Sequence, residues 1–159
     1  MSARKIIAFG ALGTLFENAR ERMLESGSLP QFMTSISILG STGSIGRSTL
    51  SVVESLSGSF VVVGLAAGRD LEGLTRQVSR FRPRLVSVAD EGDVNELRDR
   101  LRGAGVDPLP EIVFGEEGLV AVASLEGVDT IVSATVGAVG FLPTYKALSL
   151  GRRVCLANK

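Results

Sequence analysis

The sequence contains no histidine, no tryptophan and a single cysteine among its 159 residues. Without histidine, the chain lacks the commonest metal ligand and the usual imidazole base, which excludes a Ser-His-Asp hydrolase and a zinc hydrolase. The lone Cys155 cannot form a disulfide within the chain. An excess of charge of one sign is also absent, since 17 Lys and Arg balance 17 Asp and Glu. Because a chain without net charge has no summed field to attract a polyanion, nucleic acid is not an expected partner.

Long hydrophobic runs are missing as well. The apolar stretch at residues 6–16 is far shorter than the roughly 20 residues that span a bilayer. Charged residues follow it at 17–22, where a signal peptide would have a small-residue cleavage site. We therefore expect neither a targeting nor a membrane segment, and we expect a cytoplasmic protein. The length and the 45% hydrophobic content fit one compact domain.

From residue 35 onward, short β-branched runs alternate with segments of helical periodicity. This alternation is typical of parallel βαβ units. The run 60–66 is apolar on both faces, as expected when helices cover both sides of a parallel sheet. The sequence therefore predicts an α/β fold over residues 35–159: a Rossmann-like, doubly wound, mostly parallel sheet flanked by helices. Residues 1–34 are expected to be an N-terminal extension that is poorly ordered or forms a short helix.

The predicted elements follow from these runs. The expected strands are 36–39, 60–66, 85–88, 111–114, 130–133 and 153–156. The expected helices are 45–56, 71–81, 93–102, 117–123 and 141–149.

The most informative stretch is the glycine loop at 40–46, Gly-Ser-Thr-Gly-Ser-Ile-Gly, between the first of these strands and the first helix. A helix start carries unpaired N–H groups and partial positive charge, and glycines let the backbone close around a phosphate. Ser41, Thr42 and Ser44 can add hydroxyl donors. The G-x-x-G-x-x-G spacing is one residue longer than the common dinucleotide fingerprint. Three interpretations stay open: a tight packing turn, a P-loop with Ser41 and Arg47 replacing its Gly and Lys, and a dinucleotide site, which we favour.

The end of the second predicted strand bears on which dinucleotide is bound. NAD sites usually offer Asp or Glu to the ribose there, whereas Gly68-Arg69-Asp70 puts a guanidinium where a 2′-phosphate would lie. Arg69 therefore favours NADP. The alternative is an ordinary exposed surface arginine, with its positive field diluted by Asp70.

Four motifs in this order resemble those of the 1-deoxy-D-xylulose 5-phosphate reductoisomerase family: the glycine loop, Ala-Ala-Gly-Arg-Asp at 66–70, Val-Ser-Ala-Thr-Val-Gly-Ala-Val-Gly at 132–140, and Leu-Ala-Asn-Lys at 156–159. The likeness covers the NADPH-binding N-terminal domain of that family, from about Ile36 to Lys159. It implies conversion of 1-deoxy-D-xylulose 5-phosphate into 2-C-methyl-D-erythritol 4-phosphate, in isoprenoid precursor synthesis, by rearrangement and hydride transfer from NADPH. It also implies a divalent metal, Mg or Mn, and a homodimer for the full-length family.

The resemblance also assigns site residues. It implies that the pyrophosphate is held by Thr42, Gly43, Ser44 and Ile45. It implies that the adenosine 2′-phosphate is surrounded by Gly68, Arg69 and Asp70. Asn158 would contact NADPH, and Lys159 would contact the substrate. Two positions depart from the family pattern, Asp70 where Asn or Ser is more common and Val139 where Ala is customary.

The catalytic domain of the family, with its acidic metal ligands, follows the Asn-Lys motif and is not in this sequence. We expect no catalytic residue and no metal ligand here, and we expect Cys155 and Tyr145 to pack. The acidic residues expected in a solvated loop and helix start are Asp107, Glu111, Glu116 and Glu117.

The expected function is therefore that of an NADPH-binding domain which acts on 1-deoxy-D-xylulose 5-phosphate only together with a catalytic domain and is an inactive fragment alone. One alternative is a stand-alone NADP-binding module or subunit without catalysis of its own. Another is a domain like those of aspartate-semialdehyde dehydrogenase or dihydrodipicolinate reductase, which use a similar glycine loop.

Overall fold

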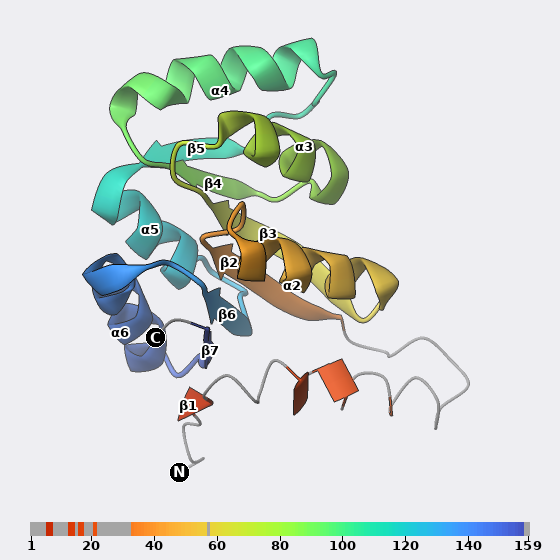
Figure 1. Ribbon diagram of the computed structural model, residues 1–159, viewed down its shortest axis with the longest axis vertical. Coiled ribbons are helices and arrows are strands. Elements are labelled where there is room, and N and C mark those ends of the chain that lie inside the picture. The colour runs from red at the N-terminus through yellow and green to blue at the C-terminus, as the bar shows by residue number, and fades with distance from the viewer. Residues whose placement is uncertain are drawn as a thin grey trace.

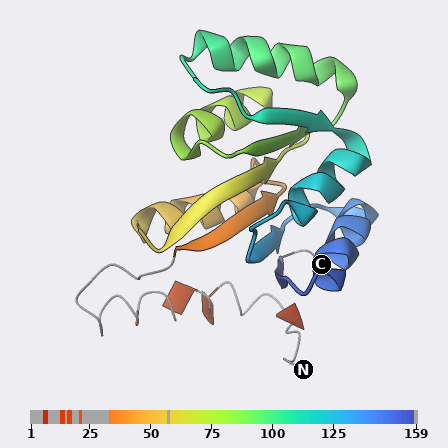
Figure 2. The ribbon, with the colours of Figure 1, turned by 180° about the vertical axis from the view of Figure 1, so that it is seen from behind.

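The computed structural model describes residues 6–7, 13–14, 16–17, 21, 33–56 and 58–157. Their centre is a seven-stranded sheet in the order β1-β7-β6-β2-β3-β4-β5, with every neighbouring pair parallel (Figures 1 and 2). The predicted α/β, doubly wound fold is confirmed. None of the helices formed by these residues has the length and apolarity that a membrane span requires.

The strands are β1 Ile6–Ile7, β2 Thr34–Leu39, β3 Phe60–Ala66, β4 Leu85–Val88, β5 Glu111–Phe114, β6 Thr130–Ser133 and β7 Arg153–Leu156. The helices are α2 Ser44–Ser55, α3 Leu71–Phe81, α4 Glu91–Gly103, α5 Gly115–Ser124, the short 3₁₀ turn η1 Gly137–Gly140, and α6 Phe141–Ser149.

All six predicted strands are present, and only β2 differs in its bounds, because it begins two residues earlier at Thr34. Helix α4 also begins earlier than predicted, at Glu91. Glu91 and Asp93 lie in its first turn, where carboxylates are stabilised by the positive end of the helix. The start of α5 moves to Gly115, whose φ of +68° is accessible to glycine.

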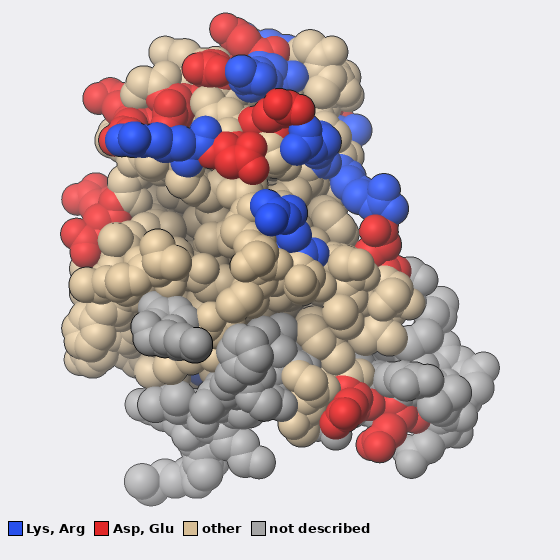
Figure 3. Space-filling view, in the orientation of Figure 1, with Lys and Arg blue, Asp and Glu red and all other residues tan. Residues whose placement is uncertain are grey.

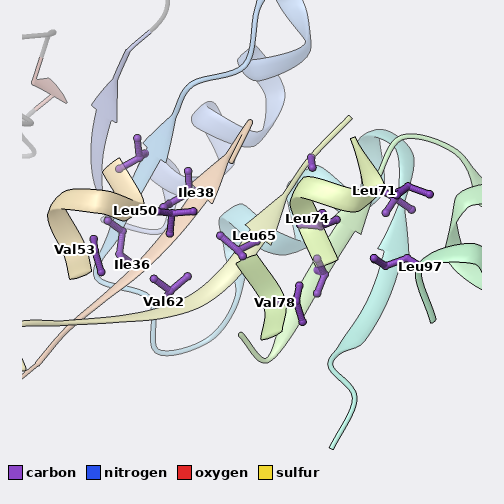
Figure 4. Close-up of a cluster of buried hydrophobic side chains, with 14 of the residues drawn as sticks. Ile36, Ile38, Leu50, Val53, Val62, Leu65, Leu71, Leu74, Val78 and Leu97 are labelled. Atoms are coloured by element: carbon purple, nitrogen blue, oxygen red, sulfur yellow. The ribbon is translucent and has the colours of Figure 1, made fainter. Parts of the chain in front are cut away.

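Helices cover both faces of the sheet, and the strand residues alternate between them. On β3, Val62 and Leu65 belong to the cluster beneath α2, α3 and α4, whereas Val63 and Ala66 belong to the cluster beneath α5 and α6. Figure 4 shows the first cluster, with side chains of α2 and α3 directed at those of β2 and β3. This two-sided burial is the physical reason for the apolar runs in the sequence.

Strand β2 lies at the point where the chain reverses its direction of travel across the sheet. It pairs with β3 on one side and with β6 on the other. The chain builds β3, β4 and β5 outward from β2, and then returns to add β6 and β7 on the opposite side. The carboxyl ends of β2, β3 and β6 therefore meet at one edge, where open α/β sheets form their binding crevice.

Part of the N-terminal region also contributes to the domain. Ile6–Ile7 pairs in parallel with Val154 and Cys155 of β7. The ring of Phe16 lies edge-to-face on Phe60, with centroids 5.5 Å apart. The sequence analysis did not predict this seventh strand.

Candidate nucleotide-binding site

The glycines of the loop between β2 and α2 serve different purposes. Gly40 has a φ of +79°, and a Cβ there would lie 2.7 Å from the carbonyl oxygen of Ala134. A Cβ at Gly46 would overlap the carbonyl oxygens of Gly40 and Ser41. Gly43 is exposed, and the nearest atom to its Cβ position is the Gly40 carbonyl oxygen at 3.3 Å. Packing therefore requires glycine at positions 40 and 46. Gly43 leaves the exposed side of the loop without a side chain.

Helix α2 begins at this loop with its positive end uncompensated. Its N-cap residue, Gly43, offers no side-chain cap, and its first turn contains no acidic residue. The amide of Arg47 reaches the Gly43 carbonyl at 2.9 Å. The amides of residues 44–46 precede the first helical hydrogen bond and point outward from the helix start. An anion placed there gains both hydrogen bonds and favourable interaction with the helix dipole.

The three loop hydroxyls are not equally accessible. Ser41 is fully buried, and its Oγ has no hydrogen-bond partner within the described residues. Thr42 is half-buried and Ser44 is exposed. The prediction that all three hydroxyls can serve a ligand is therefore wrong for Ser41, because the loop turns that side chain into the protein.

Helix α3 holds the glycine loop from the side. Gln77 donates from Nε2 to the carbonyl oxygen of Ser41 at 2.9 Å. This contact was not predicted from the sequence. The sequence did contain a signal for such a contact. Gln77 is a polar residue beside the buried stripe that Leu74 and Val78 form on α3, and a polar residue in that position needs a hydrogen-bond partner.

A second side chain holds the next carbonyl of the loop. The guanidinium of Arg47 donates from Nη1 to the carbonyl oxygen of Thr42. In a P-loop, the residue at the position of Arg47 would reach the phosphates. Arg47 instead lies against a smaller cavity between α2 and α3, so the geometry disfavours the P-loop interpretation.

A cleft of about 700 Å³ opens at the carboxyl ends of β2, β3, β4 and β6 and at the start of α5. That volume lies in the range of small-molecule and cofactor sites. The lining residues are Gly40, Thr42, Gly43, Ala66, Ala67, Gly68, Val88, Ala89, Gly115, Glu116, Leu119, Ala134, Thr135, Val136, Ala138 and Val139. The cleft thus brings together three of the predicted cofactor residues, Thr42, Gly43 and Gly68. The predicted residues Ser44, Ile45, Arg69 and Asp70 lie beside it rather than in its lining.

The turn after β3 is open on the side of the cleft. No atom lies within 4 Å of the position that a Cβ would take at Gly68. Arg69 is exposed, and it forms no ion pair within the described part of the chain. Asp70 accepts a hydrogen bond from the Gly73 amide at 2.8 Å and caps helix α3. The Asp70 carboxylate is therefore directed at a helix amide, and this reduces its electrostatic repulsion of an anion bound beside Arg69.

The part of the cleft near β6 is more apolar than the part formed by the glycine loop. Val136 and Val139 are exposed and line it. The Oγ1 of Thr135 is buried without a partner among the described residues, and a Cβ at Gly140 would overlap it. Gly140 therefore makes room for Thr135, whose hydroxyl is an unused polar group at the edge of this apolar region.

Two further predictions concern the packing of Cys155 and Tyr145. Cys155 is buried as predicted, and burial raises the pKa of its thiol. Tyr145 is also expected to pack, but its side chain is 62% exposed and lies outside the buried core. The Tyr145 ring stacks on that of Phe141, with centroids 6.5 Å apart. Helix α6 buries its other face, which carries Pro143 and Ala147.

The remaining predicted site residues are Asn158 and Lys159, and both lie outside the described residues. Over the described ranges, no three Cys, Asp or Glu side chains come together in a group that could hold a metal ion.

The sequence is similar to proteins of one known family. Residues 36–159 match the family model of 1-deoxy-D-xylulose 5-phosphate reductoisomerase. The reductoisomerase of Chlorobium phaeovibrioides is 53% identical over 127 residues, which are 80% of this chain and 32% of that protein. The enzyme of Chlorobaculum tepidum is 50% identical over the same shares of the two chains. The chain thus spans about a third of the length of the curated relatives that it matches.

Solved structures of reductoisomerases are also similar to this chain. A crystal structure of DOX-P reductoisomerase in complex with NADPH, fosmidomycin and magnesium has a TM-score of 0.74 at 35% identity, covering 79% of this chain and 30% of that one. The reductoisomerase from Zymomonas mobilis in complex with NADPH has a TM-score of 0.72 at 32% identity, covering 80% of this chain and 32% of that one.

Proposed function

Because this chain belongs to the 1-deoxy-D-xylulose 5-phosphate reductoisomerase family, we propose that residues 35–159 form an NADPH-binding domain and that the cleft is its cofactor site. One observation carries the proposal. The uncompensated start of α2 and the bare loop at Gly43 line the same cleft as the open backbone at Gly68. A dinucleotide needs both features, an anion site for its pyrophosphate and a close backbone approach for its ribose.

Three groups of residues would each hold one part of the cofactor. The pyrophosphate would lie on the amides and hydroxyls of residues 42–45. The 2′-phosphate would lie at the turn of residues 68–70, where Arg69 provides the charge. The nicotinamide would lie near Val136 and Val139, whose apolar side chains exclude water from the ring. When bound, the nicotinamide supplies a hydride.

The activity of the longer protein is a further part of the proposal. We propose that reductoisomerase chemistry on 1-deoxy-D-xylulose 5-phosphate requires chain beyond this domain, as in relatives about three times the length of the matched stretch. That chain would supply the acidic ligands of a divalent metal, Mg or Mn, and would enclose the substrate. Asn158 and Lys159 would then contact NADPH and the substrate. Homodimer formation belongs to the longer protein, and we place it in the cytoplasm.

Titration of the chain with NADPH and with NADH, followed by calorimetry, tests the proposed cofactor site. We expect NADPH to bind more tightly, and we expect Arg69→Ala to weaken NADPH about 10-fold while leaving NADH unchanged, because only NADPH carries the 2′-phosphate. Arg98→Ala is the control, since Arg98 is a half-buried arginine of α4 that bonds to Asn95 and lines neither cavity. Absence of binding, or equal affinities for the two nucleotides in the unmodified chain, would contradict the proposal.

A further inference from the structure

We propose that Arg47 is a specificity-determining residue, which supplies a cationic contact to the 2′-phosphate of NADPH in addition to that of Arg69. This inference rests on the proposed function, because it assumes that the dinucleotide occupies the main cleft. The family motifs considered above assign no role to Arg47.

The position of Arg47 follows from a second cavity, of about 290 Å³, between α2 and α3. Thr42 lines this cavity and also the main cleft, so the two adjoin at the glycine loop. Asp70, which directly follows Arg69, lines the smaller cavity as well. A phosphate on the ribose at the turn after β3 would therefore be next to the cavity that Arg47 lines.

Charge distinguishes Arg47 from the other arginines of this cavity. Arg76 pairs with Glu72, and Arg80 pairs with Glu54. Arg47 takes part in no ion pair within the described part of the chain. In Figure 3, blue groups over α3 and α4 lie beside red ones, and a further blue group lies near the start of α2. Arg47 is thus the lining cation whose charge is left for a ligand.

The Arg47 guanidinium is also held in place. One of its nitrogens donates to the Thr42 carbonyl oxygen, inside the loop that would receive the pyrophosphate. A guanidinium has five N–H donors, so most of them stay available for an anion. The carboxylate of Asp70, in the same cavity, accepts from the Gly73 amide and forms no ion pair with Arg47 among the described residues.

A buried acceptor in the same cavity fits the rest of the ligand. The Oε1 of Gln77 is buried without a partner among the described residues, while its Nε2 is engaged with the Ser41 carbonyl oxygen. A buried polar atom without a partner costs free energy until a donor reaches it. A 2′-phosphorylated ribose carries an anion and, on the adjacent carbon, a hydroxyl. Arg47 and Gln77 together present the donor and the acceptor that this pair of groups requires.

The test compares Arg47→Ala and Arg47→Gln with the unmodified chain and with the control Arg98→Ala. Gln at position 47 can keep an N–H donor for the Thr42 carbonyl oxygen but removes the charge. We expect both Arg47 variants to bind NADPH about 10-fold more weakly and NADH unchanged, by calorimetric titration, with urea unfolding showing that Arg47→Gln keeps the stability of the unmodified chain. The Arg98 control should bind both nucleotides as the unmodified chain does.

The outcomes separate this inference from the proposed function. If the unmodified chain binds neither nucleotide, the proposed function fails and the inference fails with it. If it prefers NADPH and the Arg47 variants keep that preference in full, only the inference is overturned. A parallel loss of NADPH and NADH affinity would also overturn it, because Arg47 would then act by holding the loop rather than by contacting the 2′-phosphate.

Discussion

Substitution of Gly68 by alanine separates folding from cofactor binding. A Cβ at this position meets no atom within 4 Å, and Gly68 is not among the residues with positive φ. Alanine therefore introduces no strain, and it lowers the conformational entropy of the unfolded chain. The variant should be as stable as the parent or more stable by about 0.4 to 1 kcal/mol.

The same methyl group should weaken the cofactor. If the ribose and its phosphate lie against the backbone of Gly68, the added carbon displaces them and removes one charge-assisted hydrogen bond. That loss is about 1.5 to 3 kcal/mol, or roughly 10- to 100-fold in the dissociation constant for NADPH.

Gly46→Ala provides the contrasting case. A Cβ there would overlap the backbone carbonyl oxygens of Gly40 and Ser41, and backbone at the centre of a packed loop yields less readily than a side chain. Overpacking of this kind costs about 1 to 3 kcal/mol. Gly46→Ala should therefore lower the free energy of unfolding, and lose NADPH affinity as a consequence of a displaced loop.

Both variants can be measured by urea unfolding and by calorimetric titration of the same preparations. The reasoning is refuted if Gly68→Ala binds NADPH like the parent, because no ligand would then approach that backbone. It is refuted equally if Gly68→Ala unfolds at a clearly lower urea concentration, because the open space at Gly68 would then be filled in the folded protein.

Three other predictions concern stability, pH and catalysis. The Arg152 guanidinium donates to three carbonyl oxygens at the end of α5, at residues 123–125, so Arg152→Met should lower the free energy of unfolding by about 2 kcal/mol in urea titration. A loss below about 0.5 kcal/mol would contradict this. Because burial raises the pKa of Cys155, the folded protein keeps this proton where the unfolded chain, with a thiol pKa near 8.5, has lost it. Stability should therefore be unaffected by Cys155 below about pH 8.5 and should fall above it, by up to about 1.4 kcal/mol per pH unit. Cys155→Ala should remove this alkaline component in urea unfolding under reducing conditions, and an unchanged slope would refute the assignment. Finally, the chain alone should not oxidise NADPH with 1-deoxy-D-xylulose 5-phosphate and Mg or Mn, by absorbance; substrate-dependent oxidation would overturn this.

The strands could be predicted because their signal is local. Each is a short, mainly apolar run bounded by a change in composition, and the polar residues inside β2 and β4, Ser37 and Ser87, are small and buried. β1 could not be found in this way, because a strand of two residues exists only through its pairing with β7, about 150 positions away in the chain.

The sequence indicated which glycines of the candidate site lie at the cleft, because that depends on the backbone. It did not indicate which way the neighbouring side chains point, because that depends on packing. Gly43 and Gly68, which the sequence assigns to the cofactor, both line the cleft, and their contact with a cofactor stays a prediction. Ser41 points inward, and Gln77 contacts the loop from a position 36 residues further along the chain, which only the placement of α3 beside the loop decides. Tyr145 shows a further limit: α6 has apolar side chains on two faces, periodicity does not say which face is buried, and the sheet accepts only one.

The pairing of Ile6–Ile7 with β7 determines what the rim of the sheet presents to other molecules. An unpaired rim offers a row of free amides and carbonyls, onto which a strand from another chain can add. A shortened chain starting at Met33 would keep every residue that lines the cleft, and would expose this row along β7. Such a chain should bind nucleotide normally and self-associate as its concentration rises. We therefore expect the first strand to affect self-association and to leave ligand recognition unchanged.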